Sequence, residues 1–232
     1  MGIGTTTPAT SAILETNSTT QGFLPPRMTI AQRNAISSPA QGLMIFCTDC
    51  GGGEIEVYSG IDWRNMIGGP VAPSLVIGDS YGGGKVAYIL QPGDPGYIAG
   101  QVHGLIAAAS DHSNVVEWGC YGTNIPGAEG TALGTGNQNT IDIVNGCTEP
   151  GIAARICNDL GLNGYSDWYL PSKNELNKLY LNKAAIGGFG NYPYRSSSEN
   201  DHLSAWCQNF LNGNPGPNIK KDALNVRAVR AF

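Results

Sequence analysis

The sequence predicts an α+β fold with short strands, few helices and many turns. Glycine (33 residues) and proline (14 residues) are frequent, and only 13% of the 232 residues are charged. Several short runs have strand-like patterns, and only a few segments have the apolar spacing of a helix. This composition suits an α+β or all-β protein better than a helical bundle.

A change in composition divides the chain into two expected domains. Residues 68–73 read Gly-Gly-Pro-Val-Ala-Pro, which is typical of a linker. We therefore expect a small mixed N-terminal module over 1–70 and a larger domain over 71–232. Residues 1–20 are rich in threonine and serine, bury little and form an extended lead-in in this prediction.

The expected elements follow from local patterns. In the N-terminal module they are a helix of about two turns that follows Thr29 as N-cap and strands over 43–46 and 54–58. In the second domain they are two strands around the glycine-rich turn of 75–90, a long surface loop over 122–136, and a helix over 152–160 that Gly161 ends. Ser172 and Glu175 form a capping box, which predicts another helix over 173–181.

Charge and hydropathy exclude two classes of partner. The formal net charge is −5 and the basic residues are scattered, so we expect no nucleic-acid binding. Apolar stretches are interrupted well short of the 18 residues that a membrane-spanning helix needs. The N-terminus has neither a basic region nor an apolar signal core, which leaves export open.

No enzymatic motif is present, so we expect no enzyme, no catalytic residue and no cofactor. The chain lacks GxSxG, and no pair of carboxylates is marked out for glycoside chemistry. Lys85 follows three glycines, but strand-like residues come next where a phosphate loop would open a helix. The CxxC pair Cys47 and Cys50 is a local disulfide or two free thiols; it lacks the second ligand pair of a zinc site, and we expect no metal.

The C-terminal part contains the residues with the strongest structural pattern. Trp168 anchors the core in this prediction, and residues 226–232 form a final buried strand. Arg227 and Arg230 stand three apart in it and face opposite sides. A buried arginine must be paired, and Glu199 is a candidate partner for one of them.

These residues carry a resemblance to a known family. The array Trp168-Tyr-Leu-Pro-Ser-Lys-Asn-Glu-Leu-Asn-Lys-Leu-Tyr180, Ser196-Ser-Ser-Glu199, Ala205-Trp206, Gln208, Phe210 and Val226-Arg-Ala-Val-Arg-Ala-Phe232 closely resembles the variable proteins of diversity-generating retroelements. It is also similar to related adhesin-tip domains. The resemblance covers roughly 75–232 and implies a C-type-lectin-like fold of the formylglycine-generating-enzyme type. Arg195 departs from it, because an aromatic residue is expected there, and position 195 is then a candidate for diversification.

The N-terminal module carries a second resemblance. Thr19-Thr-Gln-Gly-Phe-Leu-Pro-Pro-Arg-Met28 and Pro39-Ala-Gln-Gly-Leu-Met-Ile45 are similar to a module that precedes such domains in phage tail-fibre and surface proteins. This implies an attachment or stalk-like role for 1–70, a homotrimer formed through it, and a location on a phage virion tail or a bacterial cell surface. The expected partner is a protein or glycan receptor on a target cell.

The retroelement resemblance implies a variable region over about 191–225. Adenines of template Asn codons are randomised in such systems, and an AAC or AAT codon cannot become Lys, Glu, Gln, Met or Trp. The exceptions between 200 and 225 are Trp206, Gln208, Lys220 and Lys221. The first two belong to the scaffold pattern, and the lysines need another template codon. Six asparagines in this stretch fit unconverted template codons, although an ordinary polar surface loop would look similar.

The expected ligand-binding residues are the non-scaffold positions of this region, displayed on a fixed frame as in an antibody paratope. They are Tyr192, Tyr194, Asp201, His202, Leu203, Ser204, Cys207, Asn209, Leu211, Asn212, Asn214, Pro215, Pro217, Asn218, Ile219, Asp222, Ala223 and Leu224. The expected structural residues are Trp168, Glu199, Trp206, Arg227 and Arg230, and the strand over 226–232 fixes the frame. Cys207 is then expected to be free, and Cys120 with Cys147 is the preferred disulfide if the compartment is oxidising.

Three alternative functions stay open. A surface adhesin without diversification, or a lectin-like carbohydrate-binding domain, would have the same fold. A calcium-dependent lectin needs ligand sets such as Glu-Pro-Asn with Trp-Asn-Asp, and neither occurs. An oxidoreductase of the formylglycine-generating type needs a paired reactive cysteine, and Cys207 has no partner nearby in the sequence.

Overall fold

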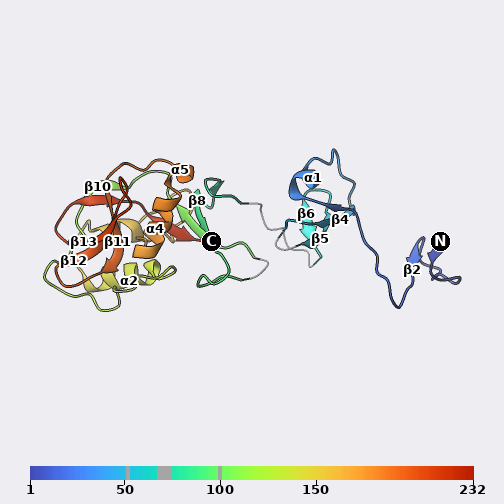
Figure 1. Cartoon of the computed structure of the whole chain (residues 1–232), viewed down its shortest axis with the longest axis horizontal. Coiled ribbons are helices and arrows are strands. Elements are labelled where there is room, and N and C mark those ends of the chain that lie inside the picture. The colour runs from blue at the N-terminus through green and yellow to red at the C-terminus, as the bar shows by residue number, and fades with distance from the viewer. Residues whose placement is uncertain (51–52, 67–74, 99–100) are drawn as a thin grey trace. The chain divides into compact units, whose positions relative to one another are not determined.

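The computed structural model describes residues 1–50, 53–66, 75–98 and 101–232. The chain divides into two compact units, Met1–Ser74 and Leu75–Phe232 (Figure 1). Each unit is described by itself.

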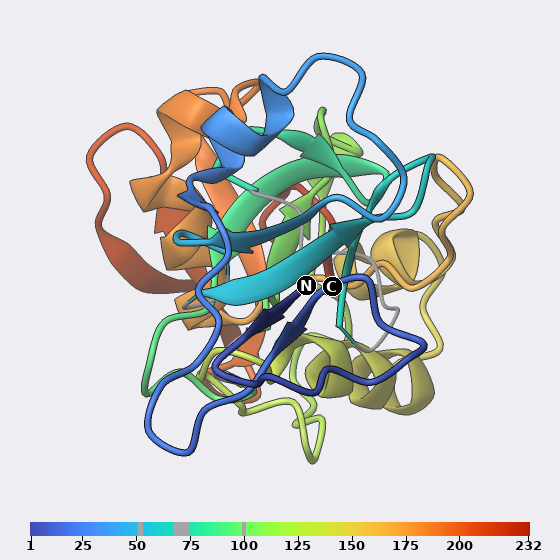
Figure 2. The ribbon, with the colours of Figure 1, turned by 90° about the vertical axis from the view of Figure 1, so that its right-hand side faces the viewer.

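Unit 1 is built from short strands and one short helix. Strands β1 (Gly2–Ile3) and β2 (Glu15–Thr16) lie side by side as a parallel pair (Figure 2). A four-stranded sheet has the order β3 (Arg27–Met28), β4 (Met44–Cys47), β5 (Glu54–Tyr58) and β6 (Trp63–Asn65). Helix α1 (Ile30–Asn34) begins after Thr29. The Thr29 side chain accepts a hydrogen bond from the Gln32 backbone N–H, and the Gln32 side chain accepts one from the Thr29 backbone N–H.

The core of unit 1 is small. Its fully buried apolar members are Ile45, Cys47 and Cys50, and the two cysteines form a disulfide. Beside them, Arg33 Nη1 of α1 donates to Glu56 Oε1 of β5 at 2.8 Å, and both side chains are buried. The ion pair therefore joins the helix to the sheet, and the disulfide links the end of β4 to the segment that follows it.

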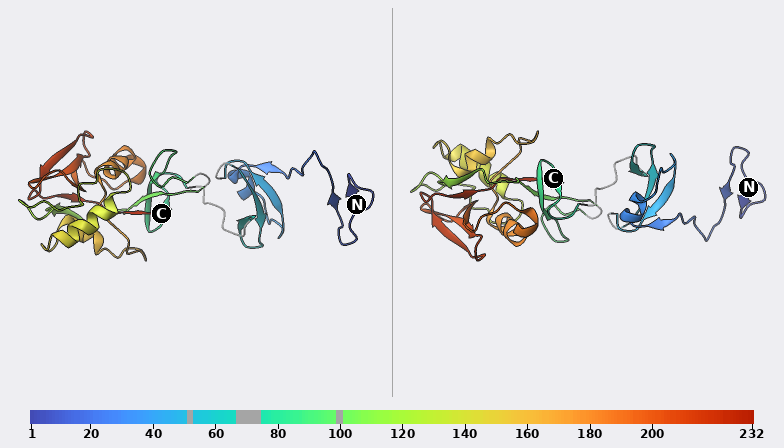
Figure 3. Two further views of the ribbon diagram at one scale, coloured as in Figure 1. Left: turned by 90° about the horizontal axis from the view of Figure 1, so that it is seen from below. Right: turned by 90° about the horizontal axis from the view of Figure 1, so that it is seen from above.

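Unit 2 contains two sheets and four helices among its described residues. The first sheet has the order β15 (Val229–Ala231), β9 (Gly104–Ala107), β8 (Gly84–Ile89) and β7 (Ser80–Tyr81). The second has the order β10 (Ser113–Val116), β14 (Leu224–Val226), β11 (Pro193–Glu199), β12 (Ser204–Asn209) and β13 (Pro215–Ile219). The helices are α2 (Gly136–Gly146), α3 (Ala153–Asn158), α4 (Lys173–Leu181) and α5 (Lys183–Ile186). In Figure 3, α2 and α3 lie side by side, and α4 lies in another part of unit 2.

The α+β class is confirmed, and local signals account for much of it. Helix α4 has the predicted bounds, because Ser172 and Glu175 form the expected capping box. The glycine-rich turn lies between β7 and β8, as predicted, and Gly82 and Gly83 have positive φ angles there. The predicted helix over 152–160 is present in shorter form as α3.

One helix was missed, and one predicted strand was wrong. Helix α2 was not predicted, and its first residue, Gly136, lies where the surface loop was expected to end. The block 226–232 is not one strand, because Arg227 and Ala228 interrupt it. Val226 ends β14, which pairs with β10 and β11, whereas β15 pairs with β9 in the other sheet. The chain thus crosses between the two sheets at this point.

Candidate ligand-binding surface

The region predicted to vary is folded around two strands at one end of unit 2. Figure 1 places β12 and β13 at the end of the unit opposite the C-terminus. Strand β12 pairs in antiparallel fashion with β11 on one side and with β13 on the other. Strand β13 is the edge of the sheet, so one side of its backbone has no strand partner.

In this region, solvent exposure separates most of the ligand-binding candidates from the buried scaffold residues. Of the eighteen candidate residues, all but Tyr194 and Leu224 are exposed or half-buried. The residues between them that the resemblance assigns to the scaffold are different: Ala205 and Phe210 are fully buried, and Gln208 is 1% exposed. The Gln208 side chain donates to the Gly213 carbonyl at 2.6 Å and so holds the turn between β12 and β13.

Tyr194 and Leu224 were wrongly predicted as ligand contacts. Tyr194 packs between Phe189 and Phe210 in the core, and its hydroxyl donates to Asp111 Oδ2 at 2.8 Å. Burial, followed by this hydrogen bond, raises the pKa of Tyr194 to about 12. Leu224 lies in β14 between β10 and β11 and is only 9% exposed. Tyr192, by contrast, is 61% exposed.

Glu199 was predicted to pair with Arg227 or Arg230, and this was wrong. Its carboxylate forms a buried ion pair with Lys220 Nζ and accepts a hydrogen bond from the Ile125 backbone at 2.9 Å. Lys220 Nζ also donates to the Thr123 carbonyl at 2.7 Å and lies 4.4 Å from the centre of the Trp118 ring. Lys220 is therefore a buried structural residue inside the region that was predicted to vary, and the sequence analysis did not identify it as structural.

The two C-terminal arginines have other partners. Arg227 is buried, and its Nε donates to Asp111 Oδ1 at 2.6 Å while Nη1 donates to the Ala108 carbonyl. Arg230 is half-buried and forms a two-point contact with the Asp167 carboxylate at 2.7 and 2.8 Å. Both arginines are thus paired with a carboxylate, but they do not share one strand, because Arg227 lies between β14 and β15.

Arg195 is buried and does not belong to the exposed surface. It lies directly opposite Cys207 in the pairing of β11 with β12. Its Nη2 donates to the backbone carbonyls of Ile219 at 2.7 Å and of Asp222, and this fixes the turn after β13. Burial lowers the pKa of Arg195 to about 10. Position 195 is therefore not a candidate for diversification, because a different side chain there would have to fit into the buried interior.

The remaining structural residues frame the same surface. Trp168 is buried in the core, as predicted. Trp206 is half-buried, and Lys173 Nζ at the start of α4 lies 3.2 Å from its ring centre. Asp201 Oδ1 accepts hydrogen bonds from the backbones of Leu203 and Ser204, which shapes the turn between β11 and β12 and lowers the pKa of Asp201.

The cysteines fall into two classes. Cys47 is bonded to Cys50, and Cys120 is bonded to Cys147, with 5.5 and 5.8 Å between the respective Cα atoms. Cys157 and Cys207 are free thiols. In the described residues, each group of side chains close enough to share a metal ion consists of one of these disulfides and a glutamate, Glu56 or Glu149.

The two units match two known families. Residues 2–79 match the family described as a phage tail like trimerisation region, and residues 110–230 match the Lcl C-terminal domain. The second match spans more than half of the chain, which therefore belongs to the Lcl C-terminal domain family. Both families comprise structural or binding proteins.

These matches confirm the resemblance that the sequence shows. The Lcl C-terminal domain is of the type found in variable proteins of diversity-generating retroelements, and a phage-tail module precedes it here. No curated protein matches the chain. A fimbrial protein from Bacteroides ovatus ATCC 8483 is among the similar solved structures, with 14% identity and a TM-score of 0.47; the alignment covers 82% of this chain and 48% of that one. No helix among the described residues is long and apolar enough to cross a membrane.

Proposed function

We propose that the chain is a receptor-binding protein in which residues 71–232 form a C-type-lectin-like domain and the exposed positions of 191–225 bind the ligand. A retroelement changes these positions and thereby the specificity of binding. Residues 1–70 attach the protein to a virion tail or a cell surface and hold it as a homotrimer. The ligand is a protein or glycan receptor on a target cell.

The observation that carries this proposal is the separation between exposed and buried positions. Sixteen of the eighteen candidate residues are accessible, while the scaffold residues Ala205, Gln208 and Phe210 between them are buried. A surface built in this way tolerates replacement of most of its displayed side chains, because buried residues form the frame; Asp201, Asn209 and Asn212 also bond to the backbone of the turns. An ordinary polar loop would not need fully buried side chains between its exposed ones.

The genetic code gives independent support. Gln208 and Lys220, which an AAC or AAT codon cannot produce, are both buried parts of the frame. Trp206, a third exception, is half-buried beneath Lys173. Lys221 alone of the four is exposed, and it requires a different template codon. Three of the four residues that a randomised AAC or AAT codon cannot encode therefore lie at buried or half-buried positions, where the frame needs a constant side chain.

The edge strand favours recognition by side chains over recognition by backbone. Pro217 lies opposite Trp206 and Pro215 opposite Gln208, on the strand that borders solvent. Proline has no N–H group to donate, so this edge is a poor template for an added strand. A ligand then contacts the displayed side chains, which are the part of the surface that can vary.

Trimer formation accounts for the exposed apolar residues of unit 1. Ile13, Phe23, Leu24, Ile61 and Met66 are between 62% and 93% exposed, beside a core with three buried apolar residues. Burial of these side chains against further copies of the chain would stabilise a trimer. The match to a trimerisation region supports further copies of this chain as the partner.

The DNA around the gene tests the proposal. We expect a nearby reverse-transcriptase gene and a near-identical repeat of the segment that encodes the variable region. Adenines of the repeat should align with the codons of the exposed positions. The codons for Ala205, Phe210 and Lys220 should lack such adenine mismatches between repeat and gene. If the surrounding DNA contained neither the repeat nor a reverse-transcriptase gene, diversification would be refuted and the protein would be an adhesin without it.

A further inference from the structure

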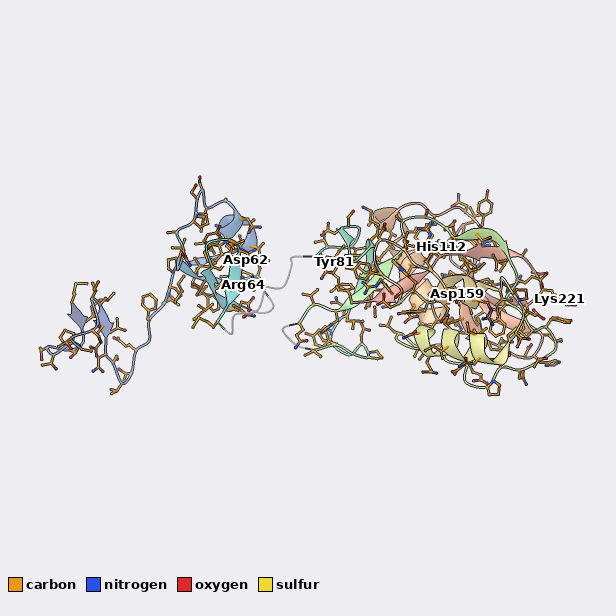
Figure 4. The ribbon with its side chains drawn as sticks, turned by 180° about the vertical axis from the view of Figure 1, so that it is seen from behind. Asp62, Arg64, Tyr81, His112, Asp159 and Lys221 are labelled. Atoms are coloured by element: carbon orange, nitrogen blue, oxygen red, sulfur yellow. A yellow bond between two sulfur atoms is a disulfide. The ribbon has the colours of Figure 1, made fainter. Side chains whose placement is uncertain are left out.

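A loop outside the variable region contributes a fixed aromatic side chain to the same surface. Tyr121 is 42% exposed and lies in the loop that follows Trp118. The backbone N–H of Gly122, next to it, donates to the His202 carbonyl at 2.8 Å. Lys221 Nζ, on the other side of the hairpin, lies 4.7 Å from the Tyr121 ring centre. Figure 4 shows Lys221 at the end of unit 2 opposite Tyr81.

Several bonds hold this loop in one conformation. Cys120 is bonded to Cys147, and its backbone N–H donates to Glu149 Oε2 at 2.9 Å. Its φ angle of 46° is in the left-handed region, which a residue with a side chain adopts only when its surroundings enforce it. Two residues after Tyr121, the Thr123 carbonyl accepts a hydrogen bond from Lys220 Nζ. The loop is thus tied to the frame on both sides of Tyr121.

Exposed apolar residues of the variable region adjoin, in the chain, the residues that contact the Tyr121 loop. Leu203 follows His202 and is 39% exposed, and its carbonyl accepts a hydrogen bond from the Lys220 backbone. Ile219, the residue before Lys220, is 50% exposed and lies opposite Ser204. The exposed charged and polar residues Asp201, His202, Lys221 and Asp222 flank these apolar residues in the chain. An apolar, aromatic centre with a rim of both charges is typical of a surface that binds another protein.

We propose that Tyr121 is a fixed anchor of the ligand-binding surface and that the ligand is a folded protein. This inference rests on the proposed function, because it assumes that the exposed positions of 191–225 bind. Tyrosine supplies a large contact area with few rotatable bonds, so an immobilised tyrosine beside changing residues contributes to binding whichever variant is displayed. A glycan fits less well, since lysine ammonium groups occupy one face of the Tyr121 ring and one of the Trp206 ring, where a sugar would stack.

Libraries of the full chain test the inference. The sixteen accessible candidate positions are randomised, and binders are selected in parallel against immobilised lysozyme and immobilised mannan as probes. Tyr121→Ala and Tyr121→Phe are then introduced into each selected clone, with Tyr97→Ala as the matched control. Tyr97 is 36% exposed and lies elsewhere in unit 2. Tm values verify that the variants fold.

We expect lysozyme binders in which Tyr121→Ala weakens affinity roughly tenfold or more while Tyr97→Ala has no effect. Tyr121→Phe should retain most of the affinity. Lysozyme binders that are indifferent to Tyr121→Ala would overturn the inference and leave the proposed function standing. Binders against mannan alone would overturn the assignment of a protein ligand. No binders against either probe would count against the proposed function itself.

Discussion

Lys220 and Glu199 form an ion pair in which the side chains are 0% and 2% exposed, in a region where the neighbouring side chains face solvent. The pair connects the end of β13 to the end of β11, and through the Ile125 and Thr123 backbones it also holds the loop before α2. A buried charge pair therefore ties the exposed hairpin to the rest of the domain.

Replacing Lys220 should destabilise the domain strongly. Lys220→Met leaves the Glu199 carboxylate buried without its partner, and loss of one member of a buried pair costs about 3–5 kcal/mol. Chemical denaturation of the full chain measures the loss. Lys221→Met is the control, because Lys221 is exposed, and it should change stability by less than about 0.5 kcal/mol. The double variant Glu199→Gln with Lys220→Met should recover part of the loss. Equal effects of the two lysine substitutions would show that the pair does not fasten the hairpin.

The Cys120–Cys147 disulfide should stabilise unit 2 by about 3 kcal/mol, because it closes a loop with a sequence separation of 27 residues. The double variant Cys120→Ser with Cys147→Ser should unfold at correspondingly lower denaturant concentration. Cys207→Ser serves as the control, since that thiol is free and half-buried. Identical unfolding curves for the double variant and the parent would contradict the prediction.

The two free thiols should differ in their reaction with iodoacetamide. Burial raises the pKa of the Cys207 thiol, and the charge of Arg195 opposes that shift in part. Cys207 is half-buried, so its alkylation should accelerate as the pH rises above the usual thiol range. Cys157 is fully buried, and burial raises its pKa much further, so it should stay unmodified in the folded protein.

Arg195→Met removes the opposing charge and should move the alkylation profile of Cys207 to higher pH. The profile is measured by mass spectrometry of the modified peptides, and Cys157→Ser should leave it unchanged. An alkylation midpoint for Cys207 below that of a free cysteine peptide would refute the predicted direction.

The full chain should be a trimer in solution. Light scattering after size-exclusion chromatography gives the mass, and Ile13→Asp with Leu24→Asp should shift it toward the monomer, because charges in an apolar interface are costly. Val76→Asp, at a position 58% exposed in unit 2, is the control and should preserve the trimer. A monomeric parent chain would contradict the assignment of unit 1.

Much of the fold could be predicted wherever the determining residues are close in sequence. The capping box of Ser172 and Glu175 fixes the start of α4 within one turn. Helix α2 has no such signal: its N-cap, Thr135, makes no side-chain hydrogen bond to the helix, and glycines stand at both ends. The Glu175 carboxylate accepts a hydrogen bond from the Gly134 backbone at 2.9 Å, a contact 41 residues away in sequence.

The candidate site was predictable in outline, and its errors share one cause. Pairings between distant segments decide which polar residues are buried. Asp111, the partner of Arg227, is 116 residues away, and Asp167, the partner of Arg230, is 63 residues away. Tyr194 and Lys220 occur among polar residues, so nothing local distinguishes them from the displayed ones. Their burial and their contacts in the folded structure show that they belong to the frame.

Sequencing many independent copies of the gene from a population that carries it tests the central claim most directly. We predict that substitutions cluster at the accessible candidate positions and are absent at Ala205, Gln208, Phe210 and Lys220. Tyr121 should also be constant. Substitutions spread evenly between exposed and buried positions of 191–225, or copies without any clustered differences, would contradict a diversified binding surface.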